Sequence, residues 1–566
     1  MQKLFNYYII NHNAINLLKE FVAKGELSVK KILTAITLIL LIGVNCLLSA
    51  CNLITINNQK YLSQTVASVD DIKISMEDLL LGYNSFGYNY VQQQSMSTEE
   101  AVKKTLETLI DRELVLKKAK EKFGDLSITK QNEVWKEVYD YVNGQVKTYA
   151  DEIIKNENWN IPSQTDETKT TATKFTPYEK KVERTKNADG SYTYSRIVEK
   201  EEETDTELIK FELNEFGNEE ITKKAYSKYI TKIKKSRDEY SKLSNDEVFE
   251  KETKRIYDIY AKNKYLTMFQ EDYENNMAVD VQKIKTKYIE LVKNSAFTYK
   301  IDKSAYDKKM QSTSSGAGEV YYHPFEESKG YIGVAHILLK YSDEQSNQIK
   351  ELETKLSNGS ITPEQYKHEL EKVANSIVVK NKQDENAPAK SVNEVFAEIS
   401  NALNACGNDE DARVKTFIKY IEMYNDDDGI MSALNSYSQY YAINLDTSVT
   451  DTMIKEFADA SRSFYTENKE TYTIYESPVL GSYGYHIIFN MGVYKNDIPL
   501  NDIDKVTETY LFETECMKGT NKSLFDKMLE LVDSSTYSEY QTSLIKDLRA
   551  GKTINYNKTA YERLYK

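Results

Sequence analysis

Two short apolar runs, each containing one histidine, limit what this chain can fold into. The run Gly333 to Lys340 reads GVAHILLK, and 150 positions after its His336 comes His486, in GYHII. Runs of β-branched and aliphatic residues are typical of buried strands. An unpaired polar group in a core costs about 1–3 kcal/mol, so each imidazole needs a hydrogen-bond partner. Strands paired in one sheet would bring the two rings together; the alternative is two unrelated core histidines.

The sequence around these runs favours long helices. Only 7 prolines and 20 glycines occur in 566 residues, and both residue types destabilise helix interiors. A chain of this length exceeds what one hydrophobic core supports, so we expect two or three domains. The net charge of −14 argues against nucleic-acid binding, which requires a basic surface.

The N-terminal region has the features of a lipoprotein signal peptide. Lys30 and Lys31 precede an apolar stretch, residues 32–44, which is shorter than a comfortable membrane span. The sequence LSAC, residues 48–51, resembles the lipobox of bacterial lipoproteins. The resemblance implies cleavage before Cys51 and stable anchoring by acyl chains attached to it. The alternative is an uncleaved anchor with an incidental cysteine.

Residues 1–28 make the segment before this apolar stretch unusually long for a signal peptide. Codons for Lys24-Gly25-Glu26 can contain a ribosome-binding sequence, and Val29 can be encoded by GTG. We therefore expect translation to start at position 29, which another codon for Val29 would contradict. The mature chain would begin with a lipidated tether, residues 51–64.

Further along the chain, residues 65–311 are expected to be mostly helical. Ser97 and Glu100 have capping-box spacing, an apolar stripe follows them, and Gly124 ends the helix. Residues 157–215 are rich in Thr and Glu, and Asp189-Gly190 predicts an inserted hairpin, with a mobile arm as the alternative. Residues 312–329 have the composition of a linker, and the chain after residue 495 is again helical in pattern.

Several segments resemble exported parvulin-type peptidyl-prolyl isomerases. VASVDDIKISMEDL and TLETLIDRELVLKKAKEKFG, within residues 65–125, resemble the chaperone region of SurA-like and PrsA-like proteins. AHILLK and GYHII resemble the first and last strands of the parvulin domain. Between them, FIKYIEMYNDDDG resembles the segment that carries the family's Cys or Asp, and DTMIKEFADASRSFY the segment that carries an apolar pair. This second resemblance spans about residues 330–494.

The resemblance implies an α+β fold with two parts. A mostly helical, discontinuous chaperone domain, residues 65–311 and 495–566, would carry a parvulin-like domain, residues 330–494, as an insertion. That inserted domain would be a small antiparallel sheet flanked by helices. The polar residues 343–395 would form a further insertion within it.

The resemblance also implies a catalytic site without metal or cofactor. His336 and His486 would form the pocket floor, and Asp427 would polarise their network. An apolar cup for the prolyl ring would be formed by Leu445, Met453 and Phe457, and Tyr483 is a further expected substrate-binding residue. Each of these residues also has a structural alternative. The two imidazoles could only brace the sheet, and Asp427 could be a solvated carboxylate in a turn. Met453 and Phe457 could simply belong to the core of a helix.

Two departures from the family pattern put the rate of the reaction in doubt. The segment SALNSYSQYYAINLDTS has no glycine where the family has a Gly-rich turn, and Tyr483 stands where a small or hydroxyl residue is usual. The mature chain's other cysteines, Cys406 and Cys516, make no metal site, and whether they pair stays open.

The expected function is that of an extracytoplasmic, lipid-anchored foldase of the Gram-positive type. Such a protein binds unfolded secreted polypeptides and catalyses cis-trans isomerisation of their X-Pro bonds. One alternative is a holdase chaperone with the same fold and a degenerate pocket. Another is a surface lipoprotein for solute binding or adhesion.

Overall fold

The computed structural model describes residues 59–157, 174–198, 204–312, 320–384, 386–448 and 453–565. Cys51, residues 1–28 and the rest of the expected signal peptide lie outside these ranges, as does most of the Ser312–Glu319 linker. The described chain is mostly helical with small antiparallel sheets, which confirms the expected α+β class. In these ranges no helix combines the length and the apolar character that crossing a membrane requires.

The chain folds into two compact units. The first unit comprises residues 1–164, 198–277 and 533–566, and the second comprises residues 165–197 and 278–532. These bounds differ from the expected domains, because residues 278–311 and 495–532 join the unit that contains residues 330–494. The physical reason is shared packing: Met310 lies in a buried cluster with Tyr331, and Met517 lies in the core around the sheet.

Long helices build the first unit: α6 (Thr98–Phe123), α7 (Ile128–Asn156), α8 (Glu219–Ser236), α9 (Asn245–Asn276) and residues from 533 onward of α19 (Leu524–Arg549). As expected, α6 begins at a capping box, in which the Ser97 N–H donates to Glu100 over 2.8 Å. It ends at Gly124, whose φ of 68° suits glycine. The apolar stripe of α6, with Leu106 and Ile110, is buried.

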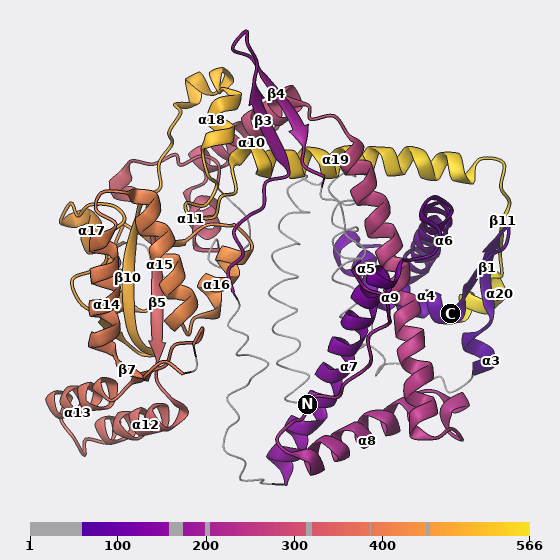
Figure 1. Ribbon diagram of the computed structural model, residues 1–566, viewed down its shortest axis with the longest axis horizontal. Coiled ribbons are helices and arrows are strands. Elements are labelled where there is room, and N and C mark those ends of the chain that lie inside the picture. The colour runs from indigo at the N-terminus through magenta and orange to yellow at the C-terminus, as the bar shows by residue number, and fades with distance from the viewer. Residues whose placement is uncertain are drawn as a thin grey trace. The chain divides into compact units, whose positions relative to one another are not determined.

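A three-stranded sheet completes the first unit by joining its two chain ends. β1 (Thr65–Val69) pairs antiparallel with β2 (Ile72–Ser75) and with β11 (Ile554–Tyr556). Figure 1 shows β1 and β11 side by side. The short helices of this unit are α3 (Gln59–Leu62), α4 (Met76–Gly82), α5 (Tyr88–Gln94) and α20 (Lys558–Tyr561).

The second unit includes the expected hairpin. β3 (Val182–Lys186) and β4 (Tyr192–Arg196) pair antiparallel, and Gly190 takes a φ of 86° in the turn between them. Helices α10 (Val281–Ile301), α11 (Lys303–Ser312) and α18 (Glu508–Glu513) belong to the same unit.

A four-stranded antiparallel sheet forms the centre of the second unit. Its order is β8-β5-β10-β9, and the four strands are β5 (Tyr331–Lys340), β8 (Tyr441–Asn444), β9 (Val479–Gly481) and β10 (Gly484–Val493). Helices around it are α14 (Val392–Ala405), α15 (Glu410–Tyr424), α16 (Asp428–Asn435) and α17 (Lys455–Thr466). Figure 1 shows β5 and β10 side by side among these helices.

Both faces of this sheet are covered. Successive side chains of a strand point to opposite faces. Phe489 of β10 stacks on Phe417 of α15, with ring centroids 4.5 Å apart. The opposite face carries His336 and His486, and Phe457 of α17 packs on it. The sheet is thus a core layer, and its histidines lie inside that core.

Two expectations remain: the polar insertion at residues 343–395, and the pairing of Cys406 with Cys516. Residues 343–395 contain α12 (Asp343–Ser357), α13 (Pro363–Asn375) and the short strands β6 (Val378–Val379) and β7 (Lys390–Ser391). Cys406 and Cys516 are free thiols, so the disulfide left open by the sequence is not formed in this structure.

Candidate active site

The two imidazoles meet on neighbouring strands. In the antiparallel register of β5 and β10, His336 pairs with Ile488 and His486 pairs with Leu338, so the rings are diagonal neighbours on one face. Their Nδ1 atoms are 3.0 Å apart, and the rings are nearly parallel, at 12°. Both side chains are almost fully buried, with 4 and 5 % exposure. Each ring therefore supplies the hydrogen-bond partner that burial of the other requires.

Asp427 completes a chain of hydrogen bonds through His336. Its Oδ2 lies 2.7 Å from His336 Nε2, and its Oδ1 accepts the Gly429 N–H at 2.9 Å. Asp427 is the N-cap of α16, where a carboxylate also interacts favourably with the helix dipole. The structure therefore joins all three expected catalytic residues in one network.

Two residues that sequence reasoning missed hold Asp427 in place, one through its carboxylate and one through its backbone. The Tyr441 hydroxyl donates to Asp427 Oδ2 over 2.6 Å. The side-chain oxygen of Asn425 accepts the backbone N–H of Leu338 at 2.9 Å and that of Asp427 at 3.1 Å. Asn425 thus ties the α15–α16 turn to β5. Neither residue stood out in the sequence, because a Tyr in a strand and an Asn in a turn are common placements.

The charge state of the network follows from its donors. Burial by itself raises the pKa of the Asp427 carboxyl, but hydrogen bonds from His336, Tyr441 and Gly429 outweigh it and hold that pKa well below its usual range. Burial and the charge of a protonated His336 together lower the pKa of His486 to about 3, against the opposing effect of the Asp427 carboxylate. His486 is therefore neutral at physiological pH, beside an ionised carboxylate.

These charges fix the direction of the hydrogen bonds. An ionised carboxylate only accepts, so His336 Nε2 carries a proton and donates to Asp427. When His336 carries this one proton, its Nδ1 accepts and the Nδ1–H of His486 is the donor. The Nε2 atom of His486 is left as an acceptor, buried and without a partner in the described part of the chain.

The surroundings of this orphan nitrogen are apolar and tight. A Cβ atom at Gly481 would lie 3.1 Å from His486 Nε2 and 2.4 Å from the Cδ1 atom of Ile454. A side chain at position 481 would therefore require Ile454 to shift. Ile454 at the start of α17 is a further neighbour of the site that sequence reasoning missed, although it adjoins the expected Met453.

The expected substrate-binding residues divide into two groups. Phe457 is buried, and its ring centroid lies 4.9 Å from that of His336 and 5.2 Å from that of His486. Leu445 and Met453 are partly buried against the same core. Tyr483 lies in the turn between β9 and β10 with 59 % exposure, so its side chain stays outside the buried cluster.

The side chains of this site can polarise a bound group through hydrogen bonds, and they can contact an apolar group. In the described ranges no group of His, Cys, Asp and Glu has the arrangement of a metal site. Comparison of the chain with protein-family models, with curated proteins and with solved structures found no match.

Proposed function

We propose that this protein is an extracytoplasmic, lipid-anchored foldase that binds unfolded exported polypeptides and isomerises their X-Pro bonds. The observation that carries the proposal is the Asp427–His336–His486 network beneath the ring of Phe457. It combines two stacked imidazoles, an ionised carboxylate and an aromatic wall on one sheet face. The resemblance of β5 and β10 to parvulin strands supports the same interpretation.

Prolyl isomerisation breaks no covalent bond, so the site needs no nucleophile. The barrier for an ordinary peptide bond is about 18–20 kcal/mol and arises from amide resonance. Resonance makes the planar amide more polar than the twisted one, so an apolar cup around the prolyl ring favours the transition state. Phe457, Leu445 and Met453 would supply that cup.

Each member of the network has a proposed role in this reaction. Asp427 fixes the tautomer of His336, and His336 fixes that of His486. His486 Nε2 then offers a lone pair at the floor of the cup, where it would accept an N–H of the bound polypeptide. This contact would hold one side of the prolyl bond while the other side rotates.

The test of catalysis is an isomerisation assay on the mature chain, residues 51–566, with Cys51→Ser to keep it in solution. The proposal expects faster cis-trans exchange of a prolyl tetrapeptide, measured by NMR exchange spectroscopy, and faster refolding of a proline-limited protein. His486→Asn should reduce both rates at least tenfold. Rates equal to the uncatalysed ones in the parent chain would refute the catalytic proposal.

A holdase without isomerase activity is the second candidate, and one observation favours it. His486 Nε2 is fully buried next to Gly481, which Ile454 approaches closely. A site closed in this way binds no prolyl ring unless Ile454 moves. Suppression of aggregation of a reduced client protein by both the parent and His486→Asn, without isomerisation by either, would establish this alternative.

The membrane anchor rests on Cys51, outside the described residues, and needs its own test. The proposal expects the full chain, expressed in a bacterium with lipoprotein processing, to partition into the detergent phase. Mass spectrometry should find the mature N-terminus at Cys51 with acyl chains attached. A Cys51→Ser chain that still partitions into detergent would contradict lipid anchoring at this residue.

A further inference from the structure

The β3–β4 hairpin of the second unit is a sheet of its own, and no third strand of the described chain pairs with it. Its end bonds run from the Asn187 N–H to the Ser191 carbonyl and from the Ile197 N–H to the Lys181 carbonyl, both at 2.8 Å. Bonded and non-bonded residue pairs alternate along an antiparallel ladder, so the odd-numbered residues bond across this hairpin. The backbone groups of the even-numbered residues therefore point away from it.

On β4 these outward groups are unpaired. The backbone N–H and C=O groups of Tyr192 and Tyr194 form no hydrogen bond with any residue that the structure describes. Thr193 between them faces Thr185 of β3 in the ladder. A row of outward donors and acceptors with the spacing of a strand is matched by another extended backbone, which can add to such an edge as a further strand.

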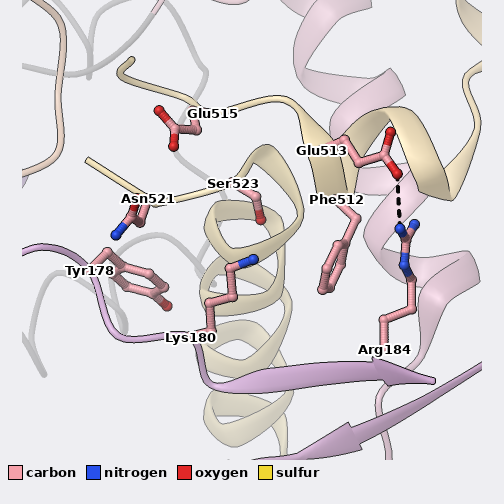
Figure 2. Close-up of a pocket in the computed structure, with 8 residues that line it drawn as sticks. All are labelled: Tyr178, Lys180, Arg184, Phe512, Glu513, Glu515, Asn521 and Ser523. Carbon is pink, nitrogen blue, oxygen red and sulfur yellow. Dashed lines mark hydrogen bonds and ion pairs between the residues drawn. The ribbon is translucent and has the colours of Figure 1, made fainter. Parts of the chain in front are cut away.

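Contacts of the inner face hold this edge in place. Val182 of β3 is fully buried. Arg184 pairs with Glu513 of α18 at 2.9 Å, as Figure 2 shows. The ring of Tyr194 stacks on that of Phe525, with centroids 5.1 Å apart. An isolated two-stranded hairpin is only marginally stable in water, so these contacts pre-organise β4 for an added strand.

The two strands differ in how their edges are protected. β3 reads VERTK, with three charged residues in five, whereas β4 reads YTYSR, with only Arg196 charged, at its end. Ile197 and Val198 follow β4 with 43 and 53 % exposure. Natural sheets protect exposed edges with charged side chains, proline or bulges, and residues 191–195 contain no charge and no proline. The open edge of the hairpin is therefore that of β4.

We propose that the outer edge of β4 binds an extended, uncharged segment of a client polypeptide, which adds to the hairpin as a third strand. The backbone groups of Tyr192 and Tyr194 would bond the backbone of the client. Client side chains on one face would lie beside these two rings, and those on the other face beside Thr193, which favours β-branched residues. The inference rests on the proposed function only in taking unfolded polypeptides as the clients.

The test uses residues 51–566 with Cys51→Ser and a fluorescein-labelled nonapeptide, Gly-Ser-Thr-Val-Thr-Val-Thr-Ser-Gly. Its matched control is the same peptide N-methylated at the central Thr and at the Val that follows. The two methyl groups remove one N–H from each edge of the peptide and leave its side chains unchanged. Fluorescence anisotropy should show at least tenfold tighter binding of the unmethylated peptide. Equal affinities of the two peptides would overturn the proposal.

Hydrogen exchange resolved to single amides identifies the edge that is used. In the complex, the amides of Tyr192 and Tyr194 should become protected. Thr193, whose amide points toward β3, should keep the protection that it has in the free chain. Protection of Arg184 and Lys186 instead would place the peptide on β3 and overturn the assignment to β4.

Two substitutions of Tyr192 separate its backbone from its side chain. Both remove the ring, whose centroid lies 4.4 Å from the Arg184 guanidinium, but only Tyr192→Pro also removes the outward N–H. Proline is tolerated at the first residue of a strand. Tyr192→Pro should bind the unmethylated peptide at least fivefold more weakly than Tyr192→Ser, with unchanged exchange at Thr193 showing that the hairpin is retained. Equal affinities of these variants would contradict strand addition at β4.

A second copy of the chain is the other possible occupant of this edge. Pairing of two β4 edges would give a dimer without peptide in sedimentation velocity, which Tyr192→Pro but not Tyr192→Ser would dissociate, and this result would overturn the client assignment. Because the peptides contain no proline, failure of the isomerase proposal does not affect the test. Conversely, a chain that isomerises a prolyl tetrapeptide but binds both nonapeptides equally would refute this inference alone.

Discussion

The residue that organises the candidate active site is Asp427, and Tyr441 is its least expected partner. Tyr441 is buried, and its hydroxyl shares Asp427 Oδ2 with His336. Burial raises the pKa of this phenol, and the Asp427 carboxylate raises it further, so Tyr441 stays a donor at any physiological pH. Because the Asp427 carboxylate is ionised and only accepts hydrogen bonds, it keeps a proton on His336 Nε2.

Tyr441→Phe should therefore destabilise the second unit. The ring is retained, but a hydrogen bond to a charged group is lost, which costs about 1.5–3 kcal/mol. We expect this loss of stability to appear as reduced hydrogen-exchange protection of β5 and β10 at pH 7. The matched control is Tyr485→Phe, which removes a more exposed hydrogen bond to Asn375. Equal effects of the two substitutions would contradict a special role for Tyr441.

His486 predicts how stability depends on pH. Its pKa is about 3 in the folded chain, against about 6.5 for a free imidazole. Between these values the unfolded chain binds a proton that the folded chain does not. Stability is therefore lost as the pH falls from about 6.5, with a slope of up to about 1.4 kcal/mol per pH unit. Asp427 adds a loss only below about pH 4, the unfolded value for a carboxyl.

Hydrogen exchange of β5 and β10 between pH 7 and 4.5, corrected for intrinsic rates, measures this slope. His486→Asn should reduce it. Burial also lowers the pKa of His323, to about 4. His323→Asn is therefore a second variant, which should remove the contribution of His323 to the slope. The same slope in the parent and in His486→Asn would show that His486 gains its proton in the folded state.

At the scale of elements, two glycines of the first unit show how backbone conformation determines helix ends. Gly144 lies inside α7, and Gly124 follows α6 with a φ of 68°. A Cβ atom at either position would meet no atom within 4 Å. Steric packing is thus equal, and the backbone conformation alone distinguishes the two positions.

Alanine substitutions at these glycines should have opposite effects. Gly144→Ala should stabilise the first unit by about 0.8–1 kcal/mol, because glycine is a poor helix former. Gly124→Ala should destabilise it by about 1–3 kcal/mol, since its φ and ψ suit glycine almost exclusively. Urea unfolding followed by the fluorescence of Trp135, which lies in α7, measures both. A shift in the same direction for both variants would contradict this explanation.

For the whole molecule, the sequence predicted elements better than it predicted their grouping. The helix after Ser97, the hairpin at Asp189-Gly190 and the two histidine strands depend on local patterns, so they could be read from the chain. Tyr441 and Ile454 became visible only in three dimensions, because nothing local relates them to Asp427 or Gly481. The same limit applies to the units. The ring of Tyr331 packs on Tyr306, 25 positions earlier and outside the expected parvulin-like range.

This grouping makes a last prediction, which concerns Met310 of α11. Its side chain is fully buried in a cluster with Tyr331 of β5 and Ala442 of β8. Met310→Ala should therefore destabilise the second unit by about 2–5 kcal/mol, although residue 310 lies outside residues 330–494. Reduced hydrogen-exchange protection of β5 and β10 in the full chain would measure the effect. Leu106→Ala, an equally buried truncation in the first unit, should leave that protection unchanged. If instead residues 330–494 were an independent domain, Met310→Ala would leave β5 as well protected as in the parent.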